Sequence, residues 1–255
     1  MKKEFNPASL SSGGELNLLK KDIPANETAA FLQLNLEIAA VLGFRNSVTP
    51  LFVQPLDKAL NRSIKRAMDI IISMFTIIIL LSWLIPLIAI LIKLDSKGPV
   101  FFLQKRNKRN SELFTCLKFR SMFVNADADF LPAVEDDQRI TRLGKFLRNH
   151  FLDELPQFFN VLWGDMSIIG PRPHMVRDND HFEKTVKNYS YRHKVKPGIT
   201  GLAQVLGYVG LADEQQKIEA RVNIDIFYVR HWCTRMDGII LFRTARKIAG
   251  FKESD

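Results

Sequence analysis

Two adjacent carboxylates, Asp153 and Glu154, are the residues of this chain whose types and spacing most directly suggest chemistry. Aspartate is a favoured N-cap residue, so the pair predicts the start of a helix over residues 155–163 that stops at Gly164. Pro156 is tolerated within the first turn. At such a helix start, both side chains can converge on one hard cation such as Mg²⁺. The competing interpretation is simple capping and favourable interaction with the helix dipole.

An arginine between two prolines, Pro171-Arg172-Pro173, follows closely in the chain. Because prolines fix the backbone on both sides, the guanidinium keeps little freedom beyond its own rotamers. A preorganised guanidinium suits bidentate binding of phosphate. Three further cations are candidate phosphate contacts: Lys118, Arg120 and Arg148. Together with the carboxylate pair they predict a site for a metal ion and a phosphate, although each cation alone is also compatible with a solvated surface charge.

A long apolar segment precedes this site. From Ile70 to Ile92 the chain has 23 residues without a charge, which as an ideal helix reach roughly 34 Å and can span a bilayer. Basic residues flank both ends, so the positive-inside rule gives no clear orientation. Pro86 lies late in the segment, where it removes the backbone bond to Ser82 and breaks or kinks a helix. The Ser82 hydroxyl can satisfy polar groups freed there. A broken helix that enters and leaves on one face is therefore an alternative to a spanning helix.

The remaining pattern predicts an α+β, helix-rich fold with a few short strands. Strands are predicted over 98–102 and 113–119 with a basic turn between them, a surface loop or short helix over 124–138, a basic helix over 141–150 and a short turn over 198–201. Residues 1–60 are predicted as a partly disordered extension with an amphipathic helix over 29–44, which lies on the membrane or packs on the main domain. Residues 61–95 form the membrane segment, and residues 96–255 form the domain that carries the site.

Composition narrows the function classes. The 255 residues carry a formal net charge of +9, which favours anionic partners such as nucleic acid, anionic lipid or phosphorylated substrates. The basic residues are dispersed among acids and form no nucleic-acid reading motif, so a nucleic-acid partner is not expected. The two cysteines are far apart in sequence and predict neither a disulfide framework nor a zinc site. The five histidines show no zinc-hydrolase spacing, and no nucleotide-binding glycine loop is present.

These residues together resemble the bacterial sugar transferase family, the monotopic polyprenyl-phosphate phosphoglycosyltransferases. The resemblance covers residues 65–251 and includes the carboxylate pair, the Pro-Arg-Pro loop and several shorter elements. Those elements are Arg66, Asp69, Gly98-Pro99, Gln104, Arg106, Lys118-Phe119-Arg120-Ser121-Met122, Lys196-Pro197-Gly198-Ile199-Thr200-Gly201, Asp225-x-x-Tyr228 and Asp237. So long an ordered series is highly specific.

The resemblance implies a re-entrant membrane helix broken near Pro86, in the bacterial inner membrane, with the catalytic domain facing the cytoplasm. It implies transfer of a sugar phosphate from a UDP-sugar to undecaprenyl phosphate with Mg²⁺ and release of UMP, as a first membrane step of exopolysaccharide or other glycan assembly. Asp153 falls at the nucleophile position and Glu154 at its acidic partner, and both are expected at the metal. Asp225 joins the expected substrate-binding residues Lys118, Arg120, Arg148 and Arg172.

The chain departs from the family in one turn, where Lys108 and Ser111 replace the usual glycines. Without several additional N-terminal transmembrane helices, it resembles the short form of the family. The stretch around His174 and residues 191–196 looks most like members that transfer glucose 1-phosphate or galactose 1-phosphate. A catalytically inactive membrane scaffold for polysaccharide enzymes is the alternative function, although it predicts a damaged carboxylate pair. The oligomeric state stays open, with a homo-oligomer among the possibilities.

Overall fold

The computed structural model describes residues 54–134, 136–209 and 215–250. The chain divides into two compact units, Met1–Val48 and Thr49–Asp255, and every described residue belongs to the second. The amphipathic helix predicted over 29–44, and all but the last residues of the predicted extension 1–60, lie outside the described residues.

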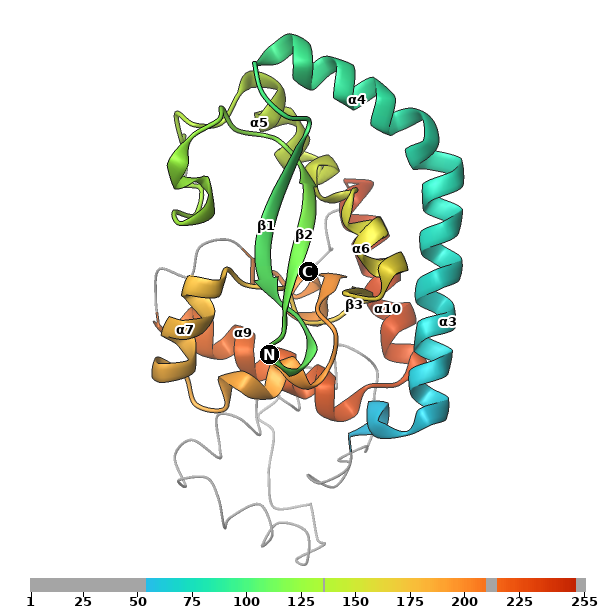
Figure 1. Cartoon of the computed structure of the whole chain (residues 1–255). Helices are drawn as coiled ribbons and strands as arrows, with labels where there is room; N and C mark the ends of the chain where they lie inside the picture. The colour runs from blue at the N-terminus through green and yellow to red at the C-terminus, as the bar shows by residue number, and fades with distance from the viewer. Residues whose placement is uncertain (1–53, 135, 210–214, 251–255) are drawn as a thin grey trace, which may run out of the picture. The chain divides into compact units, whose positions relative to one another are not determined.

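The described unit is rich in helix and contains a few short strands, which confirms the predicted balance of the fold (Figure 1). Its α-helices are α3 (Ala59–Thr76), α4 (Ser82–Asp95), α5 (Arg142–Asn149), α6 (Gln157–Trp163), α7 (Val176–Thr185), α8 (Leu202–Val205), α9 (Gln215–His231) and α10 (Thr234–Ile248). Short 3₁₀ turns are η2 (Pro55–Asp57), η4 (Arg109–Ser111), η5 (Ala126–Asp129), η6 (Leu152–Glu154) and η7 (Tyr189–Lys194). The strands are β1 (Phe101–Asn107), β2 (Leu113–Phe119), β3 (Ser167–Ile169) and β4 (Gly198–Thr200).

Strands β1 and β2 form an antiparallel hairpin, with Phe101 opposite Phe119 and Asn107 opposite Leu113. The second strand has the predicted bounds. Residues 98–102 were predicted as a turn into a short strand, and the first strand does begin there, at Phe101, but it continues through residues 104–107, which the sequence had assigned to a basic turn. Residues 104–107 have the polar and basic composition of a loop, which explains the error. Their burial nevertheless alternates as in a strand, since Gln104 is buried between exposed neighbours.

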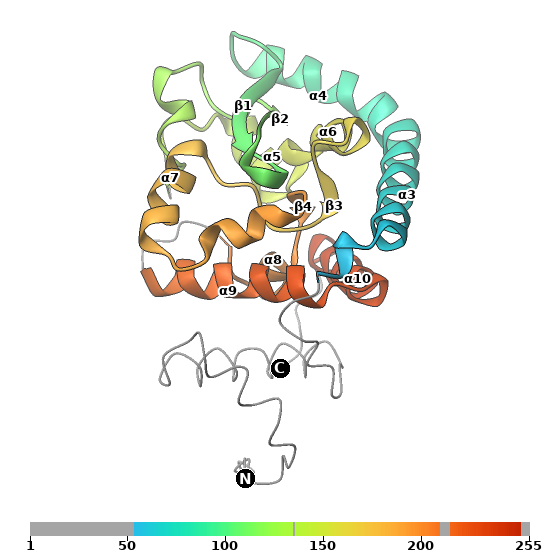
Figure 2. The ribbon, with the colours of Figure 1, turned by 60° about the horizontal axis from the view of Figure 1, so that its bottom comes forward.

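The turn predicted over 198–201 is instead a strand, since β4 pairs in parallel with β3. This pairing brings two glycine backbones together: a Cβ added to Gly198 would lie 2.1 Å from the amide nitrogen of Gly170. Glycine is therefore needed here for close packing of the backbone, rather than for a turn. Helix α10 packs on both strands (Figure 2).

Helices α3 and α4 form one continuous apolar helix, Ala59–Asp95, which is long and apolar enough to cross a membrane. Between them lies a π-helical turn, η3 (Ile77–Leu81), and α4 runs at a marked angle to α3 (Figure 1). The helix does not end at Pro86, because Pro86 lies inside α4. The departure from α geometry comes one turn earlier, and both π turns and prolines are known causes of bends. The Ser82 hydroxyl donates to the carbonyl of Ile78 at 2.7 Å.

Buried polar contacts fasten the first half of this helix to the rest of the unit. Lys65 Nζ lies 2.8 Å from Asp237 Oδ2, and the Arg66 guanidinium donates to two carbonyls at the end of α6. Asp69 accepts hydrogen bonds from the Ser167 hydroxyl and the Ile168 amide of β3. The charge of Lys65 also acts on Asp69, but the hydrogen bonds of Asp69 go to the strand.

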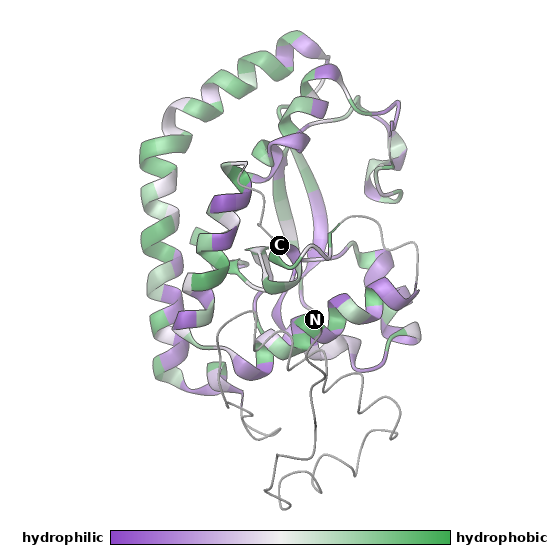
Figure 3. Ribbon diagram, turned by 180° about the vertical axis from the view of Figure 1, so that it is seen from behind, coloured by the Kyte–Doolittle hydropathy of each residue, from purple (hydrophilic) through white to green (hydrophobic). Residues whose placement is uncertain are grey.

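The second half is fastened by apolar packing. Ile88 and Ile92 of α4 are buried in one cluster with Phe119 of β2 and Leu147 of α5. Leu81 at the bend is buried, but many large apolar side chains along the helix are exposed, and Figure 3 shows the hydrophobic residues along it. The exposed large residues are Ile71, Met74, Phe75, Ile78, Ile79, Leu80, Trp83, Leu87, Ile90, Leu91 and Leu94. One apolar helix thus has both ends on the same body and a bare apolar surface between them.

Candidate active site

The carboxylate pair lies in the 3₁₀ turn η6, between α5 and α6. Phe151, just before this turn, has φ 57° and ψ 17°, a left-handed conformation that is uncommon for a bulky residue. Helix α6 begins at Gln157 with Pro156 as its N-cap, so Asp153 is not the N-cap that the sequence predicted. The predicted end of the helix is correct, since Gly164 adopts φ 97°.

Glu154 is held by two cations. The Arg172 guanidinium donates to both of its carboxylate oxygens, with Nη1 3.0 Å from Oε2, and Lys118 Nζ lies 2.9 Å from Oε1. Burial alone would raise the pKa of Glu154, but Arg172 and Lys118 outweigh it and hold the pKa well below its usual range. Glu154 is therefore a fixed negative charge between two cations.

Asp153 differs from its neighbour. Its side chain is largely buried, yet among the described residues no hydrogen bond reaches its carboxylate. Burial raises the pKa of Asp153, Lys118 opposes that shift, and the charge of Glu154 adds to it. A carboxylate without hydrogen-bond partners keeps its lone pairs available for an electrophile or a metal.

Asp153 lines a cavity of about 940 Å³. Six cationic side chains line the same cavity: Arg106, Lys118, Arg120, Arg148, Arg172 and Arg221. The acidic lining residues are Asp129, Asp153, Asp178 and Asp225. This size accommodates a small-molecule ligand, and the excess of cations favours an anionic one.

Arg148 of α5 lies in this lining, where its Nη1 is 3.4 Å from the Ser121 hydroxyl, and its charge acts on Asp153. Arg120 has a structural role that the sequence did not predict. Its guanidinium donates to the carbonyls of Ser96, Lys97 and Pro99 at 2.6–2.8 Å, which ties the end of β2 to the turn after α4. Arg120 also lines the cavity, so its predicted phosphate contact stays a prediction beside this structural role.

Asp225, predicted as a substrate-binding residue, forms a buried ion pair with Arg192 at 2.8 Å. Arg192 also donates to the backbone carbonyl of Arg172 at 2.6 Å. The pair therefore positions the backbone that carries Arg172, and through it the clamp on Glu154. Asp225 borders the cavity, and one of its carboxylate oxygens, Oδ2, accepts both hydrogen bonds from Arg192.

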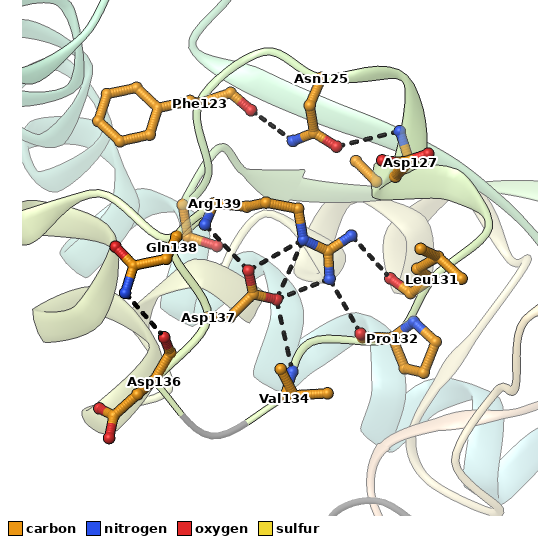
Figure 4. Close-up of polar contacts among 12 residues, drawn as sticks. Phe123, Asn125, Asp127, Leu131, Pro132, Val134, Asp136, Asp137, Gln138 and Arg139 are labelled. Atoms are coloured by element: carbon orange, nitrogen blue, oxygen red, sulfur yellow. Dashed lines mark hydrogen bonds and ion pairs between the residues drawn. The ribbon is translucent and has the colours of Figure 1, made fainter.

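A loop forms another wall of the cavity, with Phe123, Val124 and Leu131 among its lining residues. Figure 4 shows how the Asp137 carboxylate holds this loop: it accepts from the Arg139 guanidinium, which also donates to the carbonyls of Leu131 and Pro132. Arg139 keeps the pKa of Asp137 below its usual range. Asp137 therefore has a structural role in this loop, and the segment is a surface loop with the short helix η5, as predicted.

His174 lines the cavity and Arg192 supports it, and the sequence had singled out their stretches only for likeness to particular family members, without a contact for either side chain. Arg192 and Asp225 are 33 residues apart, and their spacing carries no signal of contact. His174 stood next to the Pro-Arg-Pro loop, and a position beside a preorganised arginine was the available hint. The predicted residues that the structure brings together are Asp153, Glu154, Lys118, Arg148 and Arg172.

The donor set at the cavity is compatible with magnesium that binds together with a phosphorylated ligand. Mg²⁺ is commonly held by one or two carboxylates plus substrate phosphates and waters, and Asp153 and Glu154 supply two carboxylates. Among the described residues there is no group of three or more His, Cys, Asp and Glu side chains that could hold a metal by itself. The residues therefore fit a metal that depends on its substrate for further ligands.

Three curated relatives share extended similarity with the chain. A UDP-glucose:undecaprenyl-phosphate glucose-1-phosphate transferase of Klebsiella pneumoniae is 47% identical over 201 residues, which is 78% of this chain and 43% of the relative. A UDP-N-acetylgalactosamine-undecaprenyl-phosphate N-acetylgalactosaminephosphotransferase of Aeromonas hydrophila is 44% identical, over 72% of this chain and 43% of the relative. The exopolysaccharide production protein PSS of Rhizobium leguminosarum bv. phaseoli is 41% identical, over 71% of this chain and 92% of the relative.

The chain thus spans less than half the length of the Klebsiella and Aeromonas relatives and most of the length of the Rhizobium one. The family described as Bacterial sugar transferase matches residues 60–250, a range that contains the apolar helix, the carboxylate pair and the Pro-Arg-Pro loop. The chain belongs to the bacterial sugar transferase family.

Proposed function

We propose that this protein transfers a hexose 1-phosphate from a UDP-sugar to undecaprenyl phosphate and releases UMP, with glucose or galactose as the favoured sugar. Relatives named for glucose-1-phosphate transfer to undecaprenyl phosphate support the reaction class. The observation that carries the mechanism is that the two members of the carboxylate pair have different surroundings. Asp153 is without a hydrogen-bond partner among the described residues and faces a cation-lined cavity, whereas Glu154 is clamped by Arg172 and Lys118.

In the first step, a carboxylate oxygen of Asp153 attacks the sugar-bearing phosphorus of the donor. An aspartyl oxygen–phosphorus bond forms, the bond to the bridging oxygen of the diphosphate breaks, and UMP leaves with that oxygen and its electron pair. Lys118, Arg148 and Arg172 lie where they offset the negative charge that gathers on the phosphates. Glu154 keeps two of these cations fixed.

In the second step, a phosphate oxygen of undecaprenyl phosphate attacks the same phosphorus. The new phosphorus–oxygen bond forms as the aspartyl bond breaks, and the Asp153 carboxylate is restored. The cations stabilise both displacements because each passes through similar charge on the same phosphoryl group. Asp153 and Glu154 would hold Mg²⁺, which supplies charge neutralisation on the diphosphate when it is bound.

We further propose that residues 61–95 form a re-entrant membrane element on the cytoplasmic face of the bacterial inner membrane, and that residues 96–255 form the catalytic domain. The support is that both ends of the apolar helix contact one body, through Lys65 and Asp237 at one end and Ile88, Ile92 and Phe119 at the other. A straight helix across a hydrocarbon core of about 30 Å would separate its two ends onto opposite faces. The exposed apolar residues at and around η3 are the part that would enter the lipid.

Cysteine labelling is expected to place both ends of this helix on one side of the membrane. Lys58→Cys and Lys97→Cys, each in a background without Cys116 and Cys233, put a thiol at an exposed position beside one end of the helix. In sealed vesicles of defined orientation, a membrane-impermeant maleimide should label both variants from the same side. Labelling from opposite sides would contradict the re-entrant proposal and favour a spanning helix.

The function is tested by measuring UMP release from a panel of UDP-sugars by detergent-solubilised protein, with undecaprenyl phosphate and Mg²⁺. We expect lipid-dependent release with one hexose donor, and loss of release when the metal is removed with EDTA and restored with Mg²⁺. Absence of release with every donor from folded protein would overturn the proposal and favour a membrane scaffold.

The rate of UMP release is expected to fall as the pH is lowered, and the fall should begin at a higher pH than for an enzyme whose aspartate has the usual pKa. Attack needs the charged form of Asp153, and burial raises the pKa of this group, so protonation begins above the usual value of about 4. Below that pKa, kcat/KM should drop about tenfold per pH unit.

Lys118→Met removes a cation that lowers the pKa of Asp153, so the fall of kcat/KM in acid should move to higher pH in this variant. The exposed Lys97→Met is the matched control; a fall at the wild-type pH in Lys118→Met would contradict its assignment to Asp153.

A further inference from the structure

A second pocket lies beside the turn of the β1–β2 hairpin, and it shares no lining residue with the cavity that holds Asp153. Its volume is about 440 Å³, and its walls come from η2 with the residue before it, from the hairpin turn that contains η4, and from η7. All eight lining residues are polar or charged. Ligand pockets are usually lined mainly by apolar side chains, so this composition favours a polar ligand.

Arg109 brings an unpaired positive charge to this pocket. Its side chain is half-buried, its Nε atom is buried without a hydrogen-bond partner, and it forms no ion pair with any described residue. A half-buried guanidinium without an acceptor is costly unless a ligand or water supplies one. Lys194 is the second cation of the lining, and its ammonium lies 5.3 Å from the centre of the Tyr191 ring.

The turn that carries Arg109 has a strained backbone. Asn110 and Ser111 are consecutive residues with φ 59° and 60°. Asparagine tolerates this left-handed region, but serine rarely adopts it, whereas glycine does so without steric cost. Glycine would therefore serve the turn better than Ser111 does. Strain of this kind points to a contact made by the side chain.

The Ser111 hydroxyl joins the turn to η7, since it lies 3.0 Å from Nδ1 of His193 at the wall of the pocket. Burial and the charge of Arg192 lower the pKa of His193 to about 4, so its ring is uncharged at neutral pH. The lining therefore carries two positive charges against the single negative charge of Asp57. A hydroxyl has one donor and two acceptor positions, so Ser111 keeps capacity for a further hydrogen bond.

Two cations among neutral polar groups suit a phosphate whose ester carries hydroxyl groups. The phosphate would take charge-assisted hydrogen bonds from Arg109 and Lys194. Sugar hydroxyls are matched to Ser111 and to the side-chain amide of Asn110. The lining contains no Phe, Tyr or Trp side chain on which a nucleotide base could stack.

The position of the pocket favours a soluble ligand over a lipid headgroup. About three turns of α3 separate its start at Ala59 from Ile70, the first residue of the uncharged segment. Because η2 comes directly before α3, the pocket lies at the end of this helix that is away from the exposed apolar bend.

We propose that this pocket binds a small soluble sugar phosphate, with Arg109 and Lys194 on the phosphate and Ser111 on a sugar hydroxyl. The inference goes beyond the proposed function and does not rest on it, because the pocket and the cavity have no lining residue in common.

The test measures equilibrium binding of glucose 1-phosphate, inorganic phosphate and glucose to the full chain in detergent, by titration calorimetry. Glucose 1-phosphate should bind roughly tenfold more tightly than inorganic phosphate, because the hydroxyl groups add hydrogen bonds to those of the phosphate. Glucose alone should not bind measurably. Arg109→Gln should weaken the binding of glucose 1-phosphate by roughly tenfold or more, since it removes a charge-assisted contact.

Two further variants separate this pocket from the cavity and from an effect on folding. Lys118→Met changes a residue that lines only the cavity, and it should keep the binding that Arg109→Gln loses. Ser111→Gly removes the hydroxyl and relieves the strained φ, so it should bind glucose 1-phosphate more weakly than the wild type without a lower Tm.

Arg142→Gln is the matched control, because Arg142 is exposed and lines neither site, and it should bind as the wild type does. Absence of glucose 1-phosphate binding to the folded wild type, wild-type affinity in Arg109→Gln, or an equal loss in Lys118→Met would overturn the inference. Equal affinity for inorganic phosphate and glucose 1-phosphate would overturn the ligand class. If Arg109→Gln does not fold, Lys194→Gln at an exposed position replaces it in the same comparison. A lack of UMP release with this binding intact would contradict the proposed function alone.

Discussion

Replacing Asp153 with asparagine is expected to lower lipid-dependent UMP release by roughly 10⁴-fold or more. The substitution preserves size and removes the charge and nucleophilicity of the carboxylate. Because no hydrogen bond reaches the Asp153 carboxylate among the described residues, the change disturbs few native contacts. Its effect should therefore appear in the chemical step, with the thermal stability of the protein maintained.

The same variant should also fail to retain sugar. Incubated with a donor labelled in the sugar and without undecaprenyl phosphate, the wild type is expected to keep label on the chain through the aspartyl bond, and Asp153→Asn to keep none. Asp136→Asn is the matched control, because Asp136 is an exposed aspartate whose side chain contacts Lys145 at the surface. Turnover of Asp153→Asn within tenfold of the wild type would place the nucleophile elsewhere.

Asp237→Leu is expected to lower the free energy of unfolding by about 3–5 kcal/mol, because it leaves a buried charge without its partner. Asp237 accepts from Lys65, the Tyr228 hydroxyl and the Trp232 indole, and its side chain is 2% exposed while that of Lys65 is 10% exposed. For a domain of this size, such a loss lowers Tm by roughly 10 °C. Thermal unfolding in detergent measures it.

Two comparisons show whether the loss of stability comes from the burial of the charges or from the loss of an ion pair alone. Asp165→Asn breaks an ion pair with Lys108 of the same 2.8 Å length, but both side chains are 27% exposed, so the cost should stay below about 1 kcal/mol. The double variant Lys65→Met/Asp237→Leu removes both buried charges and should recover much of the loss. Equal losses for Asp237→Leu and Asp165→Asn would contradict the explanation.

The sequence predicted those parts of the fold that depend on residues close together in the chain. The end of α6 at Gly164 follows from glycine's tolerance of positive φ, and β2 follows from its composition and flanks. The start of α6 did not follow, because the turn that carries Asp153 depends on Phe151 in a left-handed conformation, and a phenylalanine gives no sign of that in sequence. The bend of the apolar helix involves a π turn, whereas the sequence pointed only to Pro86.

The candidate site was predicted in part for the same reason. The dyad and Arg172 are close in the chain and carry a recognisable chemistry, so their association could be expected. Arg120 and Arg148 looked alike in sequence and both line the cavity, yet the Arg120 guanidinium binds backbone carbonyls while the charge of Arg148 acts on Asp153. An arginine near a phosphate site cannot be distinguished from one that holds a turn until the fold places the carbonyls. The ion pair of Asp225 with Arg192 could not be predicted, because its partner comes from a distant segment.

Lys118 in β2 and Arg120 just after it connect the carboxylate pair to the end of the apolar helix. Lys118 and Arg120 are two residues apart, and one holds Glu154 while the other holds the carbonyls of Ser96, Lys97 and Pro99 just after the apolar helix. No hinge separates these two attachments, since a single short stretch of chain carries both. The distance between the apolar helix and the carboxylate pair is therefore set by the strand, and under the proposed function it would present Asp153 at one constant depth to a lipid phosphate at the bilayer surface.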